Sequence, residues 1–113
     1  MKSKISSLSK SEDFKNLLRG RKISNAYSTI FFKKISSKNN KLLNVSFVTK
    51  KKIGNAVRRN KIKRRLRSIM RDAIKSINMN LNYSYLFIAK KNIYDANYKM
   101  IKDSIYKDLM KVR

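Results

Sequence analysis

The sequence predicts an α+β fold in which helices pack as a sandwich on one mainly antiparallel sheet, in the order α-β-β-α-β-α. Stretches of alternating or continuous apolar residues, typical of strands, separate stretches in which apolar residues recur every three or four positions, typical of helices. The length of 113 residues suits one hydrophobic core. A single domain over residues 1–113 is therefore predicted.

A short first helix is predicted near the N-terminus. Residues 9–12, Ser-Lys-Ser-Glu, have the spacing of a capping box, in which a hydroxyl and a carboxylate satisfy the first free N–H groups. Phe14, Leu17 and Leu18 are predicted to form its apolar side. Gly20 is expected to end the helix, because glycine adopts the left-handed conformation without strain.

Two strands are predicted to follow and to form an antiparallel hairpin. Residues 27–35 are rich in aromatic and β-branched side chains, which favour an extended strand. The polar run 36–41 is typical of a turn. From Leu42 to Thr49 apolar and polar residues alternate, which indicates that one face of the second strand is more buried than the other.

A long basic helix is predicted after the turn at Gly54 and Asn55. Between Ile62 and Ile77 apolar residues recur at spacings of three and four, so this side should pack on the sheet. The remaining sides are cationic, and only Asp72 is at hand to neutralise them. The cations are Arg58, Arg59, Lys61, Lys63, Arg64, Arg65, Arg67 and Arg71. They must face solvent or a phosphate backbone.

The last two elements are a strand and a helix. Residues 83–89 are almost continuously apolar, as expected of an interior strand covered on both faces. Asp95 is predicted to cap the last helix, with Asp103 and Asp108 outward among lysines. The predicted inner face of this helix consists of Tyr98, Ile101, Ile105 and Leu109.

The charge of the chain predicts a polyanionic partner. Thirty Lys and Arg residues stand against six acids, which gives a net charge of +24. No acid lies between Phe14 and Arg71. Between Lys50 and Arg67, ten of eighteen residues are basic, and a rigid helix that holds cations at fixed separations can match several phosphates at once. Asn60 can donate to and accept from a base or a 2′-hydroxyl.

Composition argues against several other classes of protein. The chain has no histidine and its carboxylates are scattered, so no catalytic residue and no metal site are predicted. It has no cysteine, and its first residues lack the apolar core of a signal peptide. No stretch approaches the ~20 apolar residues that span a bilayer, so no membrane association and a cytoplasmic location are expected.

Alternatives to RNA binding by the basic segment stay open at this point. Basic helix faces are often only solvated, and a basic amphipathic helix can lie on anionic lipid. A ribosomal protein or a general RNA chaperone would have similar charge and size. A small DNA-binding protein lacks support, because no helix-turn-helix or zinc-finger pattern appears. An enzyme that acts alone would have to show cleavage activity as the purified protein, with no RNA subunit present.

The basic segment also carries a family resemblance. Residues 51–67, KKIGNAVRRNKIKRRLR, resemble the signature of the bacterial ribonuclease P protein component, whose core is a basic-Asn-basic triplet, here Arg59, Asn60 and Lys61. The resemblance extends to residues 8–14 and to the strand at 86–91, in the same order. It implies a fold of the ribosomal protein S5 domain 2-like type.

The resemblance implies a function as the protein subunit of ribonuclease P. In that family the catalyst is an RNA, and RNA-bound Mg²⁺ performs the hydrolysis that removes the 5′ leader of precursor tRNA. The expected partners are the catalytic RNA and precursor tRNA, with no protein partner required. No metal is expected to bind the protein by itself, and the protein alone is expected to be inactive.

The resemblance also implies two sets of contact residues. The catalytic RNA is expected to contact Lys51, Lys52, Arg59, Asn60, Lys61, Lys63, Arg64 and Arg67. A cleft between the first helix and the sheet is expected to hold the single-stranded leader, with an aromatic ring on which a base can stack. Its expected residues are Phe14, Leu18, Phe31 or Phe32, and Lys90. Leu18 stands where some members carry a second aromatic residue.

Three features of the expected cleft stay undecided at this point. The register of the first strand is open between Phe31 and Phe32, and either ring could instead fill the core. Ser46 stands where the family often has glycine, and Lys50 where a small residue is common. An added lysine at this place could strengthen binding of leader phosphates.

Overall fold

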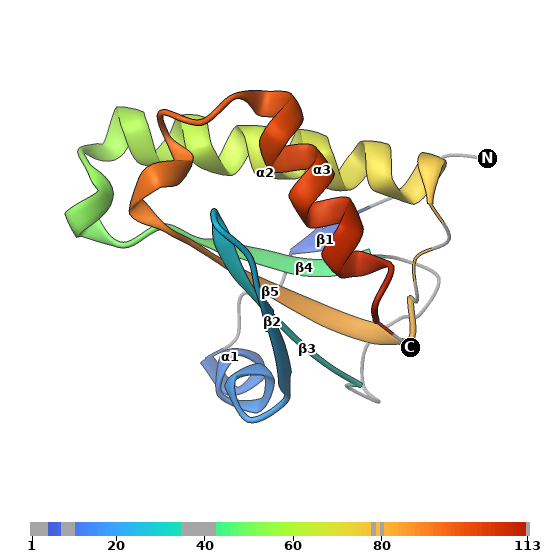
Figure 1. The fold of residues 1–113 in the computed structure, drawn as a ribbon. Coiled ribbons are helices and arrows are strands. Elements are labelled where there is room, and N and C mark those ends of the chain that lie inside the picture. The colour runs from blue at the N-terminus through green and yellow to red at the C-terminus, as the bar shows by residue number, and fades with distance from the viewer. Residues whose placement is uncertain (1–4, 8–10, 35–42, 78, 80, 113) are drawn as a thin grey trace.

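A computed structural model of the chain describes residues 5–7, 11–34, 43–77, 79 and 81–112. The strands are β1 (Ile5–Ser7), β2 (Arg21–Ser24), β3 (Ser28–Lys34), β4 (Leu43–Val48) and β5 (Tyr83–Ala89). The helices are α1 (Ser11–Leu18), α2 (Ala56–Ser76) and α3 (Tyr98–Leu109), with short 3₁₀ helices η1 (Lys51–Ile53) and η2 (Lys91–Ile93). Helices α2 and α3 cover one face of the sheet, and α1 lies on the other (Figure 1).

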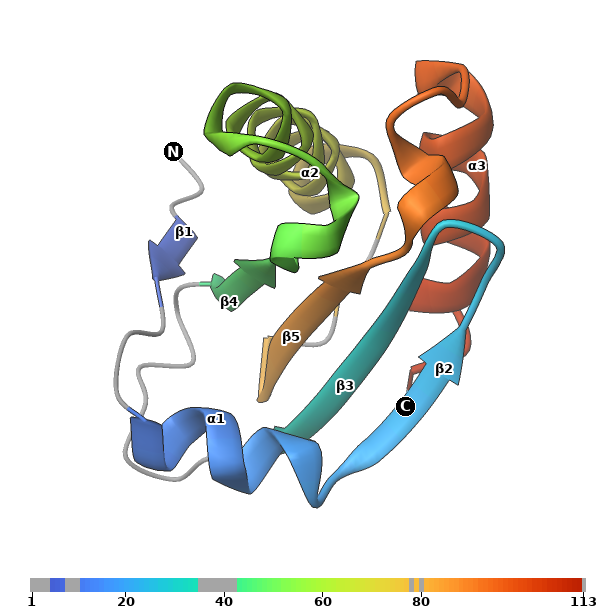
Figure 2. The same cartoon turned by 90° about the vertical axis from the view of Figure 1, so that its left-hand side faces the viewer.

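The α+β class is confirmed, but the sheet is mixed rather than mainly antiparallel. Its strand order is β1-β4-β5-β3-β2, visible from left to right in Figure 2. The pairs β2–β3 and β3–β5 are antiparallel, whereas β1–β4 and β4–β5 are parallel. Strands β1 and β2 were not predicted. They are short edge strands, and β2 is mostly exposed, so neither has a clear apolar period.

The predicted hairpin between the strands near residues 27–35 and 42–49 is wrong. Strand β5 lies between β3 and β4, with Leu86 opposite Phe31 on one side and beside Ser46 on the other. Helix α2 crosses over from β4 to β5, which makes these two strands parallel. The predicted turn at 36–41 lies outside the described residues. Alternation within β4 predicted its faces but carries no information about its neighbours.

The observed hairpin joins β2 and β3. The Asn25 N–H donates to the Ser28 carbonyl oxygen at 2.9 Å, and the register runs from Ser24 opposite Thr29 to Arg21 opposite Phe32. Strand β2 of this hairpin is one edge of the sheet, and β3 lies between β2 and β5 (Figure 2). The hairpin therefore places the turn at residues 25–27 at one end of the sheet.

The main core lies between the sheet and the helices α2 and α3. The predicted apolar side of α2 is confirmed, since Ile62, Leu66, Ile69, Met70 and Ala73 are all buried. Burying a side chain such as Leu or Ile contributes about 1.5–3 kcal/mol to folding. The buried residues of α3 and of the sheet on this side are Ile101, Ile105, Leu109, Ile30, Phe32, Leu43, Val45, Tyr85 and Phe87. Burial also raises the pKa of the Tyr85 hydroxyl above its usual range, helped by Tyr83.

Strand β5 is confirmed as an interior strand. It is the third of five strands, and its residues from Ser84 to Phe87 are buried. Alternate residues of β5 point to opposite faces, so Tyr85 and Phe87 enter the main core while Leu86 meets Leu17 of α1. The continuous apolar run is explained by this coverage on both faces.

The end of α1 differs from its prediction in two ways. Gly20 does not adopt a positive φ. Instead, a Cβ at this position would lie 2.6 Å from the Phe32 carbonyl oxygen, so glycine permits a close approach of the chain to β3. Leu18 is 51% exposed, whereas Leu17 is fully buried. Of the predicted capping box at 9–12, the first two residues lie outside the described part of the chain.

The predicted acidic positions of α3 are also corrected. Asn97, not Asp95, caps the helix, because the Asn97 side chain accepts a hydrogen bond from the Lys99 N–H at 2.8 Å. The η2 turn delays the start of α3 beyond the reach of Asp95. Asp103 is exposed as predicted, but Asp108 is only 5% exposed. None of the helices in the described residues has the length and hydropathy needed to cross a bilayer.

Candidate nucleic-acid interface

The outward side of α2 carries a line of polar and cationic side chains. Asn60, Arg64, Arg67 and Arg71 are all exposed, and at about 100° per residue they fall within a sector of roughly 60°. We call these four residues the α2 stripe. The guanidinium groups of the stripe have no hydrogen-bond or ion-pair partner among the described residues. They are therefore available to an external anion.

The start of α2 is held by an amide cap. The Asn55 side chain accepts a hydrogen bond from the Arg58 N–H at 2.9 Å. An Asn at this position is among the strongest N-caps and is worth about 1 kcal/mol. The cap holds the first turn of the basic helix directly after η1, so the exposed Lys51 and Lys52 lie close to the beginning of α2.

The one acid of α2 is turned away from the stripe. Asp72 lies toward α3, where its carboxylate is 3.5 Å from the Lys102 ammonium. The nearby Tyr106 hydroxyl and Asp72 together raise the pKa of Lys102, so the ammonium stays charged. Since this acid is paired with a cation of another helix, no negative side chain of α2 interrupts the stripe.

A second group of α2 cations is held by the protein itself. The Arg58 guanidinium lies 4.2 Å from the centroid of the Tyr94 ring, and the Lys61 ammonium lies 5.5 Å from it. The Arg65 Nη1 donates to the Tyr94 carbonyl oxygen at 3.2 Å. We call Arg58, Lys61, Arg65 and Tyr94 the Tyr94 group. Lys61, an expected RNA contact, therefore lies on the flank of α2 that faces η2 and α3, away from the stripe.

The expected RNA contacts thus divide by their place on α2. Asn60, Arg64 and Arg67 lie together on the α2 stripe. Arg59 and Lys63 are half-buried on the flank opposite the Tyr94 group. Sequence reasoning missed Arg71 as a member of the stripe. Its signal was available, because Arg71 follows Arg67 by four residues and Arg64 by seven.

The face of the sheet that carries α1 is only partly covered. Around the buried pair Leu17 and Leu86 lie half-buried Phe14 of α1, Phe31 of β3, Val48 of β4 and Ile88 of β5. We call this surface the open sheet face. It combines the expected cleft residues Phe14 and Phe31, and Ser46 lies on it beside Leu86. Leu18 follows Phe14 by one helical turn and is exposed.

Phe32 does not belong to the open sheet face. It is 4% exposed and lies in the main core, with its ring centroid 5.4 Å from that of Tyr83. The Arg21 guanidinium lies over the Phe32 ring, 4.8 Å from its centroid. Successive residues of a strand point to opposite faces, so only one of Phe31 and Phe32 can line a cleft beside α1. The structure corrects the expectation for Phe32 and leaves Phe31 as the candidate.

A cavity of about 500 Å³ adjoins the open sheet face. Thr29 and Ile88, which are paired across β3 and β5, form part of its wall. The other lining residues are Ala89 and the lysines Lys50, Lys52, Lys90 and Lys91. We call this cavity the lysine pocket. It contains Lys90, expected at the cleft, and Lys50, one of the departures from the family pattern, and it adds Lys91.

The described carboxylates form no group suited to a metal ion. No three Asp, Glu, His or Cys side chains lie together in the described part of the chain. Asp72 and Asp108 have partners within the protein. What the described surface offers to a ligand is therefore a line of guanidinium groups and a partly apolar sheet face with a lysine pocket.

Comparison with known proteins agrees with this description. The family model for Ribonuclease P matches residues 2–113. The chain is 39% identical to the ribonuclease P protein component of Fusobacterium nucleatum, over 96% of this chain and 94% of that protein. It is 29% identical to the protein component of Caldanaerobacter subterraneus, over 98% and 92% of the two chains. The solved structure of the ribonuclease P protein from Thermotoga maritima has a similar fold, with a TM-score of 0.79 at 23% identity, over 96% of this chain and 98% of that one. The chain therefore belongs to the family of bacterial ribonuclease P protein components.

Proposed function

We propose that residues 1–113 act as one RNA-binding domain that joins the catalytic RNA of ribonuclease P and the 5′ leader of precursor tRNA. The α2 stripe binds the catalytic RNA, and the open sheet face with the lysine pocket binds the leader. The RNA performs the endonucleolytic cleavage that gives the mature tRNA 5′ end. The protein acts in the cytoplasm and requires no protein partner.

The α2 stripe is the observation that carries this proposal. It presents Arg64, Arg67 and Arg71, which have no partner in the described part of the chain, while Asp72 is paired on another side of the helix. Arginine presents a planar fork that matches phosphate oxygens in pairs. On the same stripe, the amide of Asn60 adds a donor and an acceptor for a base edge or a 2′-hydroxyl. Free cations on a rigid helix support recognition of a folded RNA rather than a solvated surface.

The open sheet face supports binding of a single strand. The rings of Phe14 and Phe31 are half-buried, so each keeps an exposed part against which a base can stack. The lysine pocket follows at the end of the same face and can neutralise a backbone phosphate. An apolar floor followed by a cationic pocket suits a strand whose bases and phosphates must both be accommodated.

Magnesium is assigned to the RNA in this proposal. When bound to the catalytic RNA, the ion supplies the activated water and stabilises charge on the scissile phosphate. The described residues of the protein do not offer a cluster of carboxylates for it. The protein's own part is to bind, to orient and to bring positive charge to the substrate.

The test is cleavage of a precursor tRNA at low magnesium concentration. Three reactions are compared: the cognate catalytic RNA alone, the purified protein alone, and the two together. We expect cleavage in the mixture to be faster than with RNA alone, and none with protein alone. A mixture no faster than RNA alone would favour a ribosomal or chaperone function, and cleavage by the protein alone would contradict catalysis by the RNA.

A paired variant separates RNA binding from total charge. Arg64→Ala with Arg67→Ala removes two cations of the α2 stripe, whereas Lys99→Ala with Lys107→Ala removes two exposed cations of α3. Both variants lower the net charge equally. We expect only the first pair to weaken binding of the catalytic RNA. Equal losses for both pairs would mean that net charge, not the α2 stripe, recognises the RNA.

A further inference from the structure

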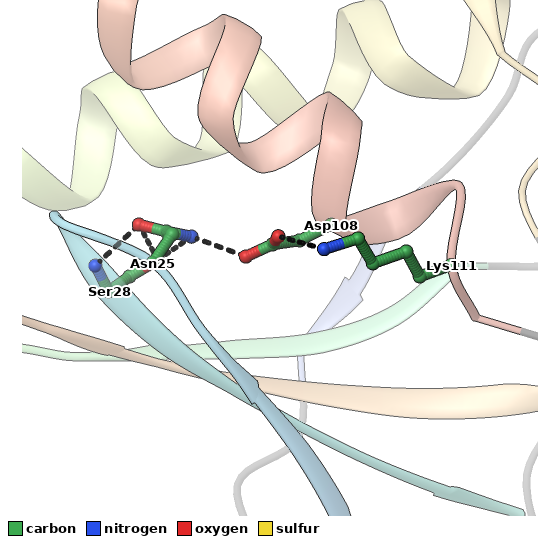
Figure 3. A network of polar contacts seen from close by, with 4 residues as sticks. All are labelled: Asn25, Ser28, Asp108 and Lys111. Carbon is green, nitrogen blue, oxygen red and sulfur yellow. Dashed lines mark hydrogen bonds and ion pairs between the residues drawn. The ribbon is translucent and has the colours of Figure 1, made fainter.

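Asp108 is an unusual acid in this strongly basic chain. It lies on the inner side of α3 and is 5% exposed. Its Oδ1 lies 3.9 Å from the exposed Lys111 ammonium, and its Oδ2 accepts a hydrogen bond from Asn25 Nδ2 at 3.0 Å (Figure 3). A buried carboxylate is costly unless it is hydrogen-bonded. The contact with Asn25 therefore joins the end of α3 to the turn between β2 and β3.

The other side of the Asn25 amide holds the turn itself. Asn25 Oδ1 accepts hydrogen bonds from the backbone N–H of Tyr27 at 2.8 Å and of Ser28 at 2.9 Å. Its Nδ2 also donates to the Ser28 hydroxyl at 3.2 Å. An Asn side chain that binds its own turn in this way stabilises one backbone conformation. Asp108 orients the amide from one side, and the amide orients the backbone of residues 25–28 from the other.

The turn at residues 25–28 also holds Lys90, which lines the lysine pocket. The Lys90 ammonium donates to the Asn25 carbonyl oxygen at 2.6 Å and to the Ser24 hydroxyl at 2.8 Å. The backbone N–H of Lys90 donates to the Tyr27 carbonyl oxygen at 2.8 Å. An ammonium group has three donors. The described residues occupy two of them, so one N–H of Lys90 remains for a ligand.

We propose that Asp108 and Asn25 are positioning residues that hold the Lys90 ammonium ready for a phosphate of the precursor tRNA leader. The inference rests on the proposed leader binding and adds to it the residues that orient one contact. A lysine side chain normally loses much rotamer freedom on binding. Because Lys90 is already held by two acceptors, less freedom remains to be lost when a phosphate binds. Neither Asp108 nor Asn25 needs to touch the RNA.

The experiment measures the affinity of the assembled holoenzyme, protein with catalytic RNA, for leader-bearing precursor and for leaderless tRNA. Lys90→Met is expected to weaken binding of the precursor by about tenfold, as for loss of one charge-assisted hydrogen bond, and to leave leaderless tRNA unchanged. Asp108→Ala is expected to weaken binding of the precursor by at least about threefold, because Lys90 is displaced rather than removed. Binding of leaderless tRNA should not change. Asp108→Asn keeps an acceptor for Asn25 and should retain the affinity for precursor.

Two further variants keep the inference testable if Asp108→Ala folds poorly. Asn25→Asp keeps the oxygen that accepts from Tyr27 and Ser28 but removes the donor to Asp108, so it should lower precursor affinity as Asp108→Ala does. The double variant Asp108→Ala with Lys90→Met should bind precursor no more weakly than Lys90→Met alone, because both changes act through one ammonium group.

The outcomes separate this inference from the function on which it rests. If Asp108→Ala only lowers thermal stability, or weakens precursor and leaderless tRNA equally, the positioning function is overturned. If Lys90→Met leaves the preference for precursor intact while Phe14→Ala lowers it, the leader binds the open sheet face but not through Lys90. If neither variant changes the preference, leader binding itself fails and this inference with it.

Discussion

The α2 stripe and the open sheet face with its adjoining lysine pocket both offer positive charge, but they are built in different ways. The stripe consists of Asn60 and three exposed arginines, which have no partner among the described residues, on the outer side of a helix whose inner side forms part of the main core. The open sheet face has half-buried aromatic and aliphatic side chains, and the Lys90 ammonium of its pocket already has two acceptors within the protein. One surface offers free charge, and the other offers shape with charge held in place.

This difference implies different kinds of recognition. Free guanidinium groups bind phosphates largely without regard to sequence, and their affinity falls steeply with salt. Binding through ring surfaces and a positioned cation depends more on how a single strand lies across them, and its affinity depends less on ionic strength. The two surfaces should therefore respond differently to the same measurements, and five variants test this difference and its structural basis.

The largest effect is expected from the neighbouring residues Phe31 and Phe32. Phe32→Ala empties part of the main core and should lower the free energy of unfolding by about 3–5 kcal/mol. Phe31→Ala removes a half-buried ring and should cost clearly less, while weakening binding of leader-bearing precursor. Urea unfolding of both variants, together with precursor affinity, checks this. A greater loss of stability for Phe31→Ala than for Phe32→Ala would show that Phe31, not Phe32, lies in the main core.

The next effect concerns the α2 stripe. Arg64→Ala with Arg67→Ala should weaken binding of the catalytic RNA by roughly 30- to 1,000-fold, since each of the two lost charge-assisted contacts is worth about 1–2 kcal/mol at an exposed site. The log–log salt slope should become shallower by about 1.4–1.8. Filter binding over a series of salt concentrations measures both values. An unchanged salt slope would show that these arginines do not neutralise phosphates.

A smaller effect is expected on the open sheet face. Phe14→Ala should weaken binding of leader-bearing precursor by about 1–3 kcal/mol, the contribution of one stacked base, and leave leaderless tRNA unaffected. Its salt slope should match that of the unmodified protein, because no charge is removed. Equal losses for the two substrates would rule out this ring as a leader contact.

The smallest effect is expected for the Tyr94 group. Tyr94→Leu removes the ring below Arg58 but keeps the backbone carbonyl that accepts from Arg65. We expect a loss of about 0.5–1 kcal/mol in stability, as for an exposed cation–π contact, and binding of the catalytic RNA within about twofold of normal. Thermal unfolding and RNA titration test both. A loss of RNA affinity as large as that of the α2 stripe variant would make this flank part of the interface.

The sequence alone was sufficient for the features that depend on local spacing. The apolar side of α2 and the inner face of α3 follow from the helical period of their apolar residues, and the interior position of β5 follows from its continuous apolar run. The concentration of cations between Lys50 and Arg67 is likewise a property of the chain. The outward position of Arg64 and Arg67 follows from both, because a helix that buries one side must expose the other.

Only the tertiary structure decided the features that depend on which elements meet. Insertion of β5 between β3 and β4 made the sheet mixed and assigned Phe31 to the open sheet face and Phe32 to the core. Contact between α3 and the β2–β3 turn buried Asp108, which its lysine-rich neighbourhood in the sequence marked as exposed. Strand pairing and helix docking join residues far apart in the chain, and a local period carries no information about a distant partner.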